Sequence, residues 1–254
     1  MAIIVFQHST LCGPGRLGAT LRDHGFQLDI RRPDLHGAAA IPPDLDNVHG
    51  VVSLGGPQNV GESHPWMEPE LAFLRRAHAA QLPIIGVCLG SQLAAHALGG
   101  KVGPMGEGGG GGGGGAGSAK IEAGFTKLSI NPAGQIEPML AGLLWDSMQF
   151  QLHGQEVKAL PPDAANFAGS AACKTQAWRA GLRTFGFQHH FECDRPMIDM
   201  LVKDSEEWLR PHGVTVSDIA AQADRHYPEF ARLADRLCVN LATFLFPFER
   251  RVRQ

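Results

Sequence analysis

One cysteine, Cys88, has the sequence neighbours expected of a nucleophile. It follows the apolar run Leu82–Val87, is flanked by Gly86 and Gly90, and precedes a helical pattern. This G-x-C-x-G spacing predicts the strand, sharp turn and helix of a nucleophile elbow. The glycines allow a tight turn, and the N-terminus of the following helix favours a thiolate over a thiol. The alternative is a buried free cysteine at an ordinary strand-to-helix turn.

A cysteine nucleophile needs a base, and the histidine pair His189-His190 offers one. In an extended segment Gln188, His190 and Glu192 share one face, while His189 points the other way. A carboxylate two residues after a histidine can orient its ring, which predicts a Cys88, His190, Glu192 relay. Two alternatives remain: a structural histidine bonded to a nearby carboxylate, and a metal pair at 189–190, which diverging neighbours on a strand disfavour.

The first half of the chain alternates strands with helices. Strands are predicted at 3–6, 26–30, 50–54 and 82–87, and helices at 17–24, 68–80 and 91–98, with an irregular stretch at 33–47. This alternation predicts a parallel sheet whose ligands bind beyond the carboxyl ends of the strands. The turn Gly55-Gly56-Pro57 and Cys88 both fall at that edge and could meet in space.

The second half reads differently. Strands at 127–130, 147–155, 166–170, 175–179 and 184–190 suggest a mostly antiparallel run, with a short helix at 137–141. Helices at 195–209, 216–225 and 227–244 form a tail that is most simply structural. We therefore expect a domain over residues 1–193 and a helical extension over 194–254. The glycine run 106–118 reads as a flexible loop or an unreliable piece of sequence, and no Lys-Ser or Lys-Thr makes it a phosphate cradle.

Composition narrows the function. The chain has 254 residues, of which 44% are hydrophobic and 19% charged, with a net charge of -3. These are globular values that give no reason to expect nucleic acid or a membrane as partner. The five cysteines never occur in C-x-x-C spacing, which argues against a disulfide framework or a structural zinc site. Without a signal segment, a cytoplasmic protein is the default expectation.

Three separated motifs carry a family resemblance. They are Ser53-Leu54-Gly55-Gly56-Pro57, Gly86-Val87-Cys88-Leu89-Gly90-Ser91-Gln92, and the segment Gly186 to Glu192. In this order they resemble the oxyanion strand, nucleophile elbow and G-x-Q-x-H-P-E motif of the class I glutamine amidotransferase (triad glutaminase) family, including stand-alone proteins similar to the glutaminase domain of GMP synthase. The resemblance implies an α/β fold: a flavodoxin-like open sheet, mostly parallel, with helices on both faces.

The resemblance also implies roles for individual residues. Cys88 would attack the side-chain amide of glutamine, with His190 and Glu192 completing the triad. Backbone N–H groups of Gly56 and Leu89 would form the oxyanion hole, and Gln92 and Gly55 would bind substrate. The chemistry requires neither a metal nor an organic cofactor. Since no P-loop and no S-G-G-x-D-S loop is present, the ammonia acceptor would be a separate synthetase or acceptor subunit.

Departures from the family pattern leave other functions open. Phe191 stands where the family usually has proline, and Gln155 where an aspartate usually follows the His-Gly pair. One rival is a γ-glutamyl hydrolase acting on a γ-glutamyl amine or peptide. A second is the related fold that pairs an elbow cysteine with an acidic residue for stress-response chemistry, which His190 and Glu192 argue against. A third is a regulatory subunit that has lost turnover.

Overall fold

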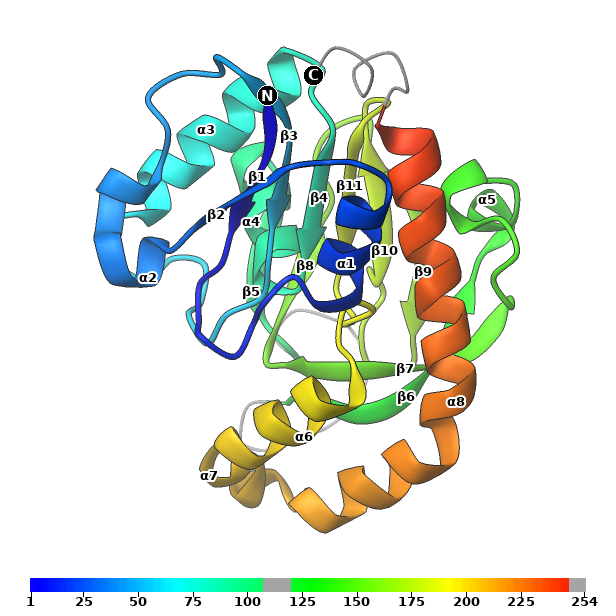
Figure 1. Ribbon diagram of the computed structural model, residues 1–254. Coiled ribbons are helices and arrows are strands. Elements are labelled where there is room, and N and C mark those ends of the chain that lie inside the picture. Colours follow the sequence, from blue (N-terminus) through cyan, green and yellow to red (C-terminus); the bar gives the residue numbers. More distant parts are fainter. Residues whose placement is uncertain (107–119, 247–254) are drawn as a thin grey trace.

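A mixed sheet forms the centre of the molecule. The computed structural model describes residues 1–106 and 120–246 (Figure 1). Within these residues the sheet has nine strands in the order β2-β1-β3-β4-β11-β10-β9-β6-β7. Its strands are β1 (Ala2–Phe6), β2 (Leu28–Arg31), β3 (Val48–Ser53), β4 (Ile84–Val87), β6 (Glu122–Ile130), β7 (Asp146–His153), β9 (Ala165–Ser170), β10 (Ala177–Ala180) and β11 (Thr184–Phe187).

The sheet changes from parallel to antiparallel at β11. Strands β2, β1, β3, β4 and β11 pair in parallel, whereas β10, β9, β6 and β7 pair antiparallel beyond them. The parallel strands are mostly buried runs such as Ile84–Val87, because helices cover both faces. This arrangement confirms the predicted α/β sheet and its later antiparallel strands.

Helices pack on both faces of the sheet (Figure 1). The helices are α1 (Gly15–Asp23), α2 (Pro33–His36), α3 (Met67–Ala79), α4 (Leu89–Ala97), α5 (Pro132–Gln135), α6 (Arg195–Asp204), α7 (Glu206–Leu209) and α8 (Val216–Asn240). Side chains of α1, α6 and α8 share one hydrophobic cluster with the sheet, and those of α3 and α4 share another. The tail helices therefore belong to the same core as the residues before 194.

The final helix differs from the prediction of two helices separated near residue 226. Helix α8 is continuous through Pro228 and is followed by a π-helical segment, Leu241–Leu245. Its buried residues Ile219, Ala223, Phe230, Leu233 and Leu237 keep one apolar stripe against the sheet. Burial of that stripe outweighs the roughly 3 kcal/mol cost of an internal proline. Figure 1 shows the helix changing direction along its length.

Three further elements depart from the expected pattern. The strand predicted at 184–190 ends at Phe187, because Gln188 N–H turns to the carbonyl of Gln176 and His190 N–H to that of Phe150. The pair β5 (Lys101–Pro104) and β8 (Gln155–Ala159) forms a small antiparallel sheet that the sequence pattern did not indicate. The helix expected at 137–141 is a short 3-10 turn at Pro138–Leu140. Residues 107–118 of the glycine run lie outside the described residues.

Candidate active site

Cys88 occupies the turn between β4 and α4. Its backbone has φ 51° and ψ -110°, a conformation that costs a non-glycine residue about 1–3 kcal/mol. Its N–H donates to the carbonyl of Phe187 at 2.8 Å, which ties the turn to the neighbouring strand β11. The strained residue of the elbow is thus the cysteine itself.

The two glycines beside Cys88 are required by close contacts. A Cβ on Gly90 would lie 1.9 Å from the carbonyl oxygen of Ser53, and a Cβ on Gly86 would lie 2.6 Å from that of Gly90. Both distances are far inside van der Waals contact. Helix α4 can therefore pass this close to strands β3 and β4 only with glycine at these positions.

His190 and Glu192 form a buried pair just beyond β11. Nδ1 of His190 lies 2.8 Å from Oε1 of Glu192, and the two residues are 3% and 1% exposed. The thiol of Cys193 donates to the same carboxylate oxygen at 3.6 Å. With Nδ1 donating to Glu192, the other ring nitrogen of His190 is left for the substrate side.

Cys88 and His190 meet beside Gly55. A Cβ placed on Gly55 would lie 2.9 Å from Cε1 of His190 and 3.6 Å from Cβ of Cys88. Burial by itself lowers the pKa of His190, but the charges of Glu192 and Cys88 more than offset it and hold this pKa well above 6.5. The arrangement favours an imidazolium between a carboxylate and a thiolate.

The turn after β3 lies next to the start of α4. A Cβ on Gly56 would lie 3.0 Å from Cδ2 of Leu89, so these two expected oxyanion-hole residues are neighbours. Leu89 is the first residue of α4, where a backbone N–H has no partner within the helix. Gly90 N–H donates to the carbonyl of Leu54 at 3.1 Å and fixes the two segments together.

A buried polar network, which the sequence did not reveal, supports this turn. Glu70 of α3 accepts hydrogen bonds from His8 Nε2 at 2.9 Å and from Ser53 Oγ at 2.7 Å. His8 Nδ1 in turn lies 3.0 Å from the carbonyl of Leu54. Burial alone lowers the pKa of His8, but Glu70 and these hydrogen bonds raise it above 6.5 overall. The pair thus holds the Ser53–Leu54 segment from behind.

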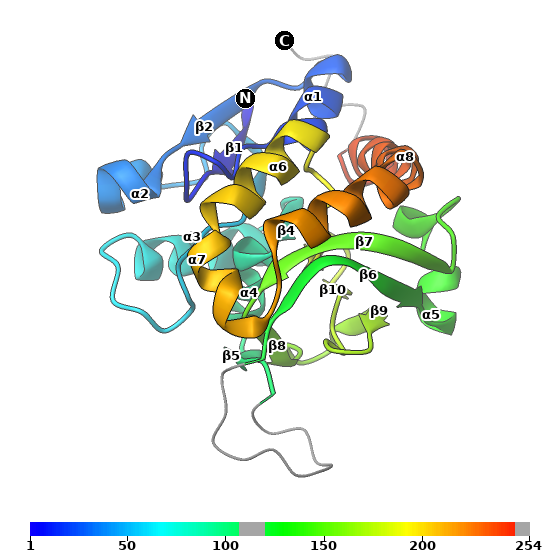
Figure 2. The ribbon, with the colours of Figure 1, turned by 90° about the horizontal axis from the view of Figure 1, so that it is seen from below.

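Cys88 and His190 open into one cavity of about 390 Å³. Gly56, Leu89 and Gln92 also line it, as do residues 201, 204, 205 and 208 of α6 and α7 and their junction. Figure 2 shows α6 and α7 lying across this end of the molecule. The tail, expected to be structural, therefore also contributes a wall of the cavity.

Gln92, expected to contact substrate, is held by the protein. Its Nε2 donates to the backbone carbonyl of Gln155 at 2.9 Å and to Oε1 of Gln188 at 3.1 Å. The side chain of Gln155, where the family has aspartate, instead accepts from Val60 N–H at 2.9 Å. Gln155 thus joins the cavity wall to the loop after β3.

Phe191, in place of the family proline, leaves the His190–Glu192 contact intact. Its side chain is fully buried and packs edge-on against Phe187 at a ring distance of 5.0 Å. Its other neighbour, His189, has a pKa lowered to about 3 by burial and by the positive charge of His190. His189 therefore stays neutral in the core, on the side away from Cys88.

Comparison with known proteins gives one family. The glutamine amidotransferase class-I family matches residues 16–197. The glutamine amidotransferase-like protein YfeJ of Salmonella typhimurium is 27% identical over 192 residues, covering 74% of each chain. A glutamine-hydrolyzing GMP synthase subunit of Natronomonas pharaonis is 27% identical over 68% of this chain and 78% of its own. GMP synthase of Porphyromonas gingivalis is 30% identical, but the match spans only 26% of that protein.

Solved structures show the same fold. A glutamine amidotransferase from Thermotoga maritima aligns with a TM-score of 0.79 at 19% identity, covering 96% of this chain and 98% of its own. One from Methylobacillus flagellatus aligns with a TM-score of 0.76 at 24% identity, covering 94% and 93%. Among the described residues, no helix combines the length and apolar character needed to cross a membrane. The elbow, the three motifs and the matched residues together mean that this chain belongs to the class-I glutamine amidotransferase family.

Proposed function

We propose that the chain hydrolyses the side-chain amide of glutamine through a thioester on Cys88 and releases ammonia for an acceptor. One observation carries the proposal: the strained cysteine of the elbow and the buried His190–Glu192 pair border the same cavity beside Gly55. A thiolate beside an imidazolium is the state that attacks an amide carbon.

In the first half-reaction, the Cys88 thiolate forms a bond to the amide carbon of glutamine. The negative oxygen of the tetrahedral intermediate would accept hydrogen bonds from the N–H groups of Gly56 and Leu89, of which the second also lies at a helix N-terminus. His190 then gives its proton to the departing nitrogen, so that ammonia leaves and a γ-glutamyl thioester remains.

In the second half-reaction, His190 is neutral and acts as the base. It takes a proton from a water molecule, whose oxygen attacks the thioester carbon. Collapse of this intermediate breaks the carbon–sulfur bond, releases glutamate and restores the Cys88 thiolate with a protonated His190. Glu192 keeps the ring in one orientation and stabilises its positive charge in both steps.

The ammonia would pass to a separate synthetase or acceptor subunit. The sequence has no P-loop and no S-G-G-x-D-S loop. Its relative in Natronomonas pharaonis carries the name of one lettered subunit of GMP synthase, which describes a part of a larger enzyme. We therefore propose the same division of labour for this chain.

A γ-glutamyl amine is a second candidate substrate, and the composition of the cavity favours it. Among the described residues that line the 390 Å³ space, none is lysine or arginine, while Asp204 and Trp208 stand on the α6–α7 side. A carboxylate and an aromatic ring suit a cationic amine. The same triad would cleave such an amide.

Ammonia release from glutamine tests the proposal. We expect Cys88→Ala to reduce release to the uncatalysed rate, while Cys238→Ala, which changes a buried cysteine in α8, retains it. Equal release from wild type and Cys88→Ala would remove the triad. If wild type releases amine from γ-glutamyl amines but little ammonia from glutamine, the second candidate replaces the first.

A further inference from the structure

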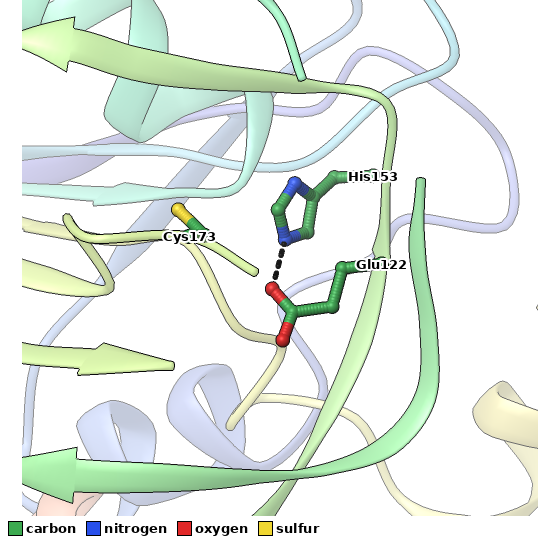
Figure 3. Close-up of side chains that lie close together, drawn as sticks. All are labelled: Glu122, His153 and Cys173. Carbon is green, nitrogen blue, oxygen red and sulfur yellow. Dashed lines mark hydrogen bonds and ion pairs between the residues drawn. The ribbon is translucent and has the colours of Figure 1, made fainter. Parts of the chain in front are cut away.

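Three metal-ligating side chains converge away from the catalytic cysteine. Glu122 begins β6, His153 ends β7, and Cys173 lies in the turn between β9 and β10 (Figure 3). One ligand atom from each lies within 4.8 Å of the other two, and all three residues are buried. Glu122 and His153 face each other across the β6–β7 ladder, so the strand register itself brings them together.

The groups around this cluster are already arranged as they are around a bound metal. His153 Nδ1 donates to the backbone carbonyl of Gln155 at 2.9 Å, which directs Nε2 toward Glu122. The carboxylate of Glu122 accepts from Thr126 Oγ1 at 2.7 Å and from Gln176 Nε2 at 2.8 Å. Such outer hydrogen bonds fix the orientation of metal ligands.

The spacing within the cluster also suits an ion. Nε2 of His153 lies 3.2 Å from Oε2 of Glu122, close to the roughly 3.3 Å that separates two ligands of a tetrahedral ion with bonds of about 2.0 Å. An ion between them would replace one hydrogen bond, that between His153 and Glu122. The carboxylate oxygens keep their bonds to Thr126 and Gln176, since each oxygen has two lone pairs.

We propose that Glu122, His153 and Cys173 bind a zinc ion, with water as the fourth ligand. Nitrogen, oxygen and sulfur donors together suit zinc, whereas magnesium and calcium take oxygen ligands. On binding, the thiol of Cys173 loses its proton to solvent as the zinc–sulfur bond forms. One carboxylate and one thiolate then balance the two positive charges, so the buried site is neutral.

The position of the site gives the ion a structural role. A surface groove of about 560 Å³, lined by Glu122, Thr126, Ala171 and Ala172, gives access to the cluster. The carbonyl of Gln155 that accepts from His153 also accepts from Gln92 of the cavity wall. Zinc would therefore tie β6, β7 and the β9–β10 turn together and steady that wall without touching the reacting atoms.

Direct metal binding tests this proposal independently of catalysis. The full chain, stripped with a chelator, is dialysed against zinc alone and its metal content measured. We expect about one zinc per chain in wild type and a rise in melting temperature when zinc is added. With cobalt in place of zinc, a sulfur-to-cobalt charge-transfer band in the near ultraviolet should appear.

Variants locate the ion. Cys173→Ser should abolish the cobalt band and weaken zinc binding at least about 10-fold, and Glu122→Gln should weaken it without removing the sulfur. Cys238→Ser, at another buried cysteine, should bind as wild type does. The proposal is overturned if wild type binds no stoichiometric zinc, or if Cys88→Ala abolishes binding while Cys173→Ser does not, since the ion then sits at the catalytic cysteine. Ammonia release is not a readout here.

Discussion

At the level of single residues, the charge on His190 governs the proposed chemistry. The ring is almost fully buried, which by itself would favour the neutral form, yet it lies 2.8 Å from Glu192 and beside Cys88. Two negative groups hold its pKa well above 6.5, so the imidazolium that must protonate the leaving ammonia persists at neutral pH. The orientation of the ring rests on one carboxylate oxygen.

Replacing Glu192 with glutamine tests this point. Removing the carboxylate removes a cause that raises the pKa of His190, so the ring loses its proton at a lower pH. We expect kcat to fall by roughly 10²- to 10⁴-fold and the alkaline loss of activity to begin at lower pH than in wild type. A pH–rate profile measures both effects.

Glu156→Gln is a matched control, because Glu156 pairs with Lys158 away from the cavity. Its profile should match that of wild type. An alkaline limb that stays in place in Glu192→Gln would mean that the carboxylate does not set the charge of His190.

At the level of elements, the site depends on how closely α4 passes β3. The carbonyl of Ser53 occupies the place where a side chain on residue 90 would begin. The same segment of β3 is held from behind by Glu70 and His8. The elbow and the oxyanion turn are thus positioned by one crossing of elements.

Gly90→Ala should separate these two elements. A Cβ 1.9 Å from the Ser53 carbonyl oxygen forces the backbone to move, at a cost of at least about 2 kcal/mol in unfolding free energy. Chemical denaturation measures the loss. Gly13→Ala, where a Cβ would meet nothing within 4 Å, should change stability little, and equal effects at both positions would contradict the close approach.

Glu70→Gln tests whether the buried network positions the oxyanion turn. The change leaves a donor facing either His8 or Ser53, so we expect a loss of about 1–3 kcal/mol in stability. Displacement of the turn should lower kcat roughly 10- to 100-fold with a smaller change in KM. The exposed Glu68, on the same helix, pairs with Arg75, and Glu68→Gln should do neither. A variant with lower stability but unchanged kcat would restrict Glu70 to a structural role.

At the level of the whole molecule, the tail helices share the core of the sheet. Phe230 of α8 is fully buried and packs edge-on against Phe125 of β6 at a ring distance of 5.5 Å. Asn240 donates to the carbonyls of Met139 and Ala141 at 3.0 and 2.8 Å. We therefore expect the tail and the preceding residues to unfold together, although the sequence suggested a boundary at 193.

Phe230→Ala should destabilise the chain by about 3–5 kcal/mol while keeping a single unfolding transition. Phe244, in the π-helical segment, is 56% exposed, and Phe244→Ala should cost little. Calorimetry distinguishes the outcomes: two separate transitions in wild type would show that the tail is an independent unit.

The sequence by itself determined the local features of this protein. Buried parallel strands, the elbow at Cys88 and the carboxylate two residues after His190 follow from short-range patterns, because each depends on neighbours within a few positions. The alternation of strands and helices likewise indicated the sheet edge at which a site would form. Resemblance of three motifs supplied the family.

Only the tertiary structure decided which distant residues meet. Glu70 lies 62 positions from His8, and Cys173 lies 20 from His153, with no motif to mark either pair. Continuity of α8 through Pro228 and the cavity wall formed by α6 and α7 also depend on burial against the sheet. Contacts of this kind arise from packing of the whole chain, and local sequence carries no signal of a partner that lies across the fold.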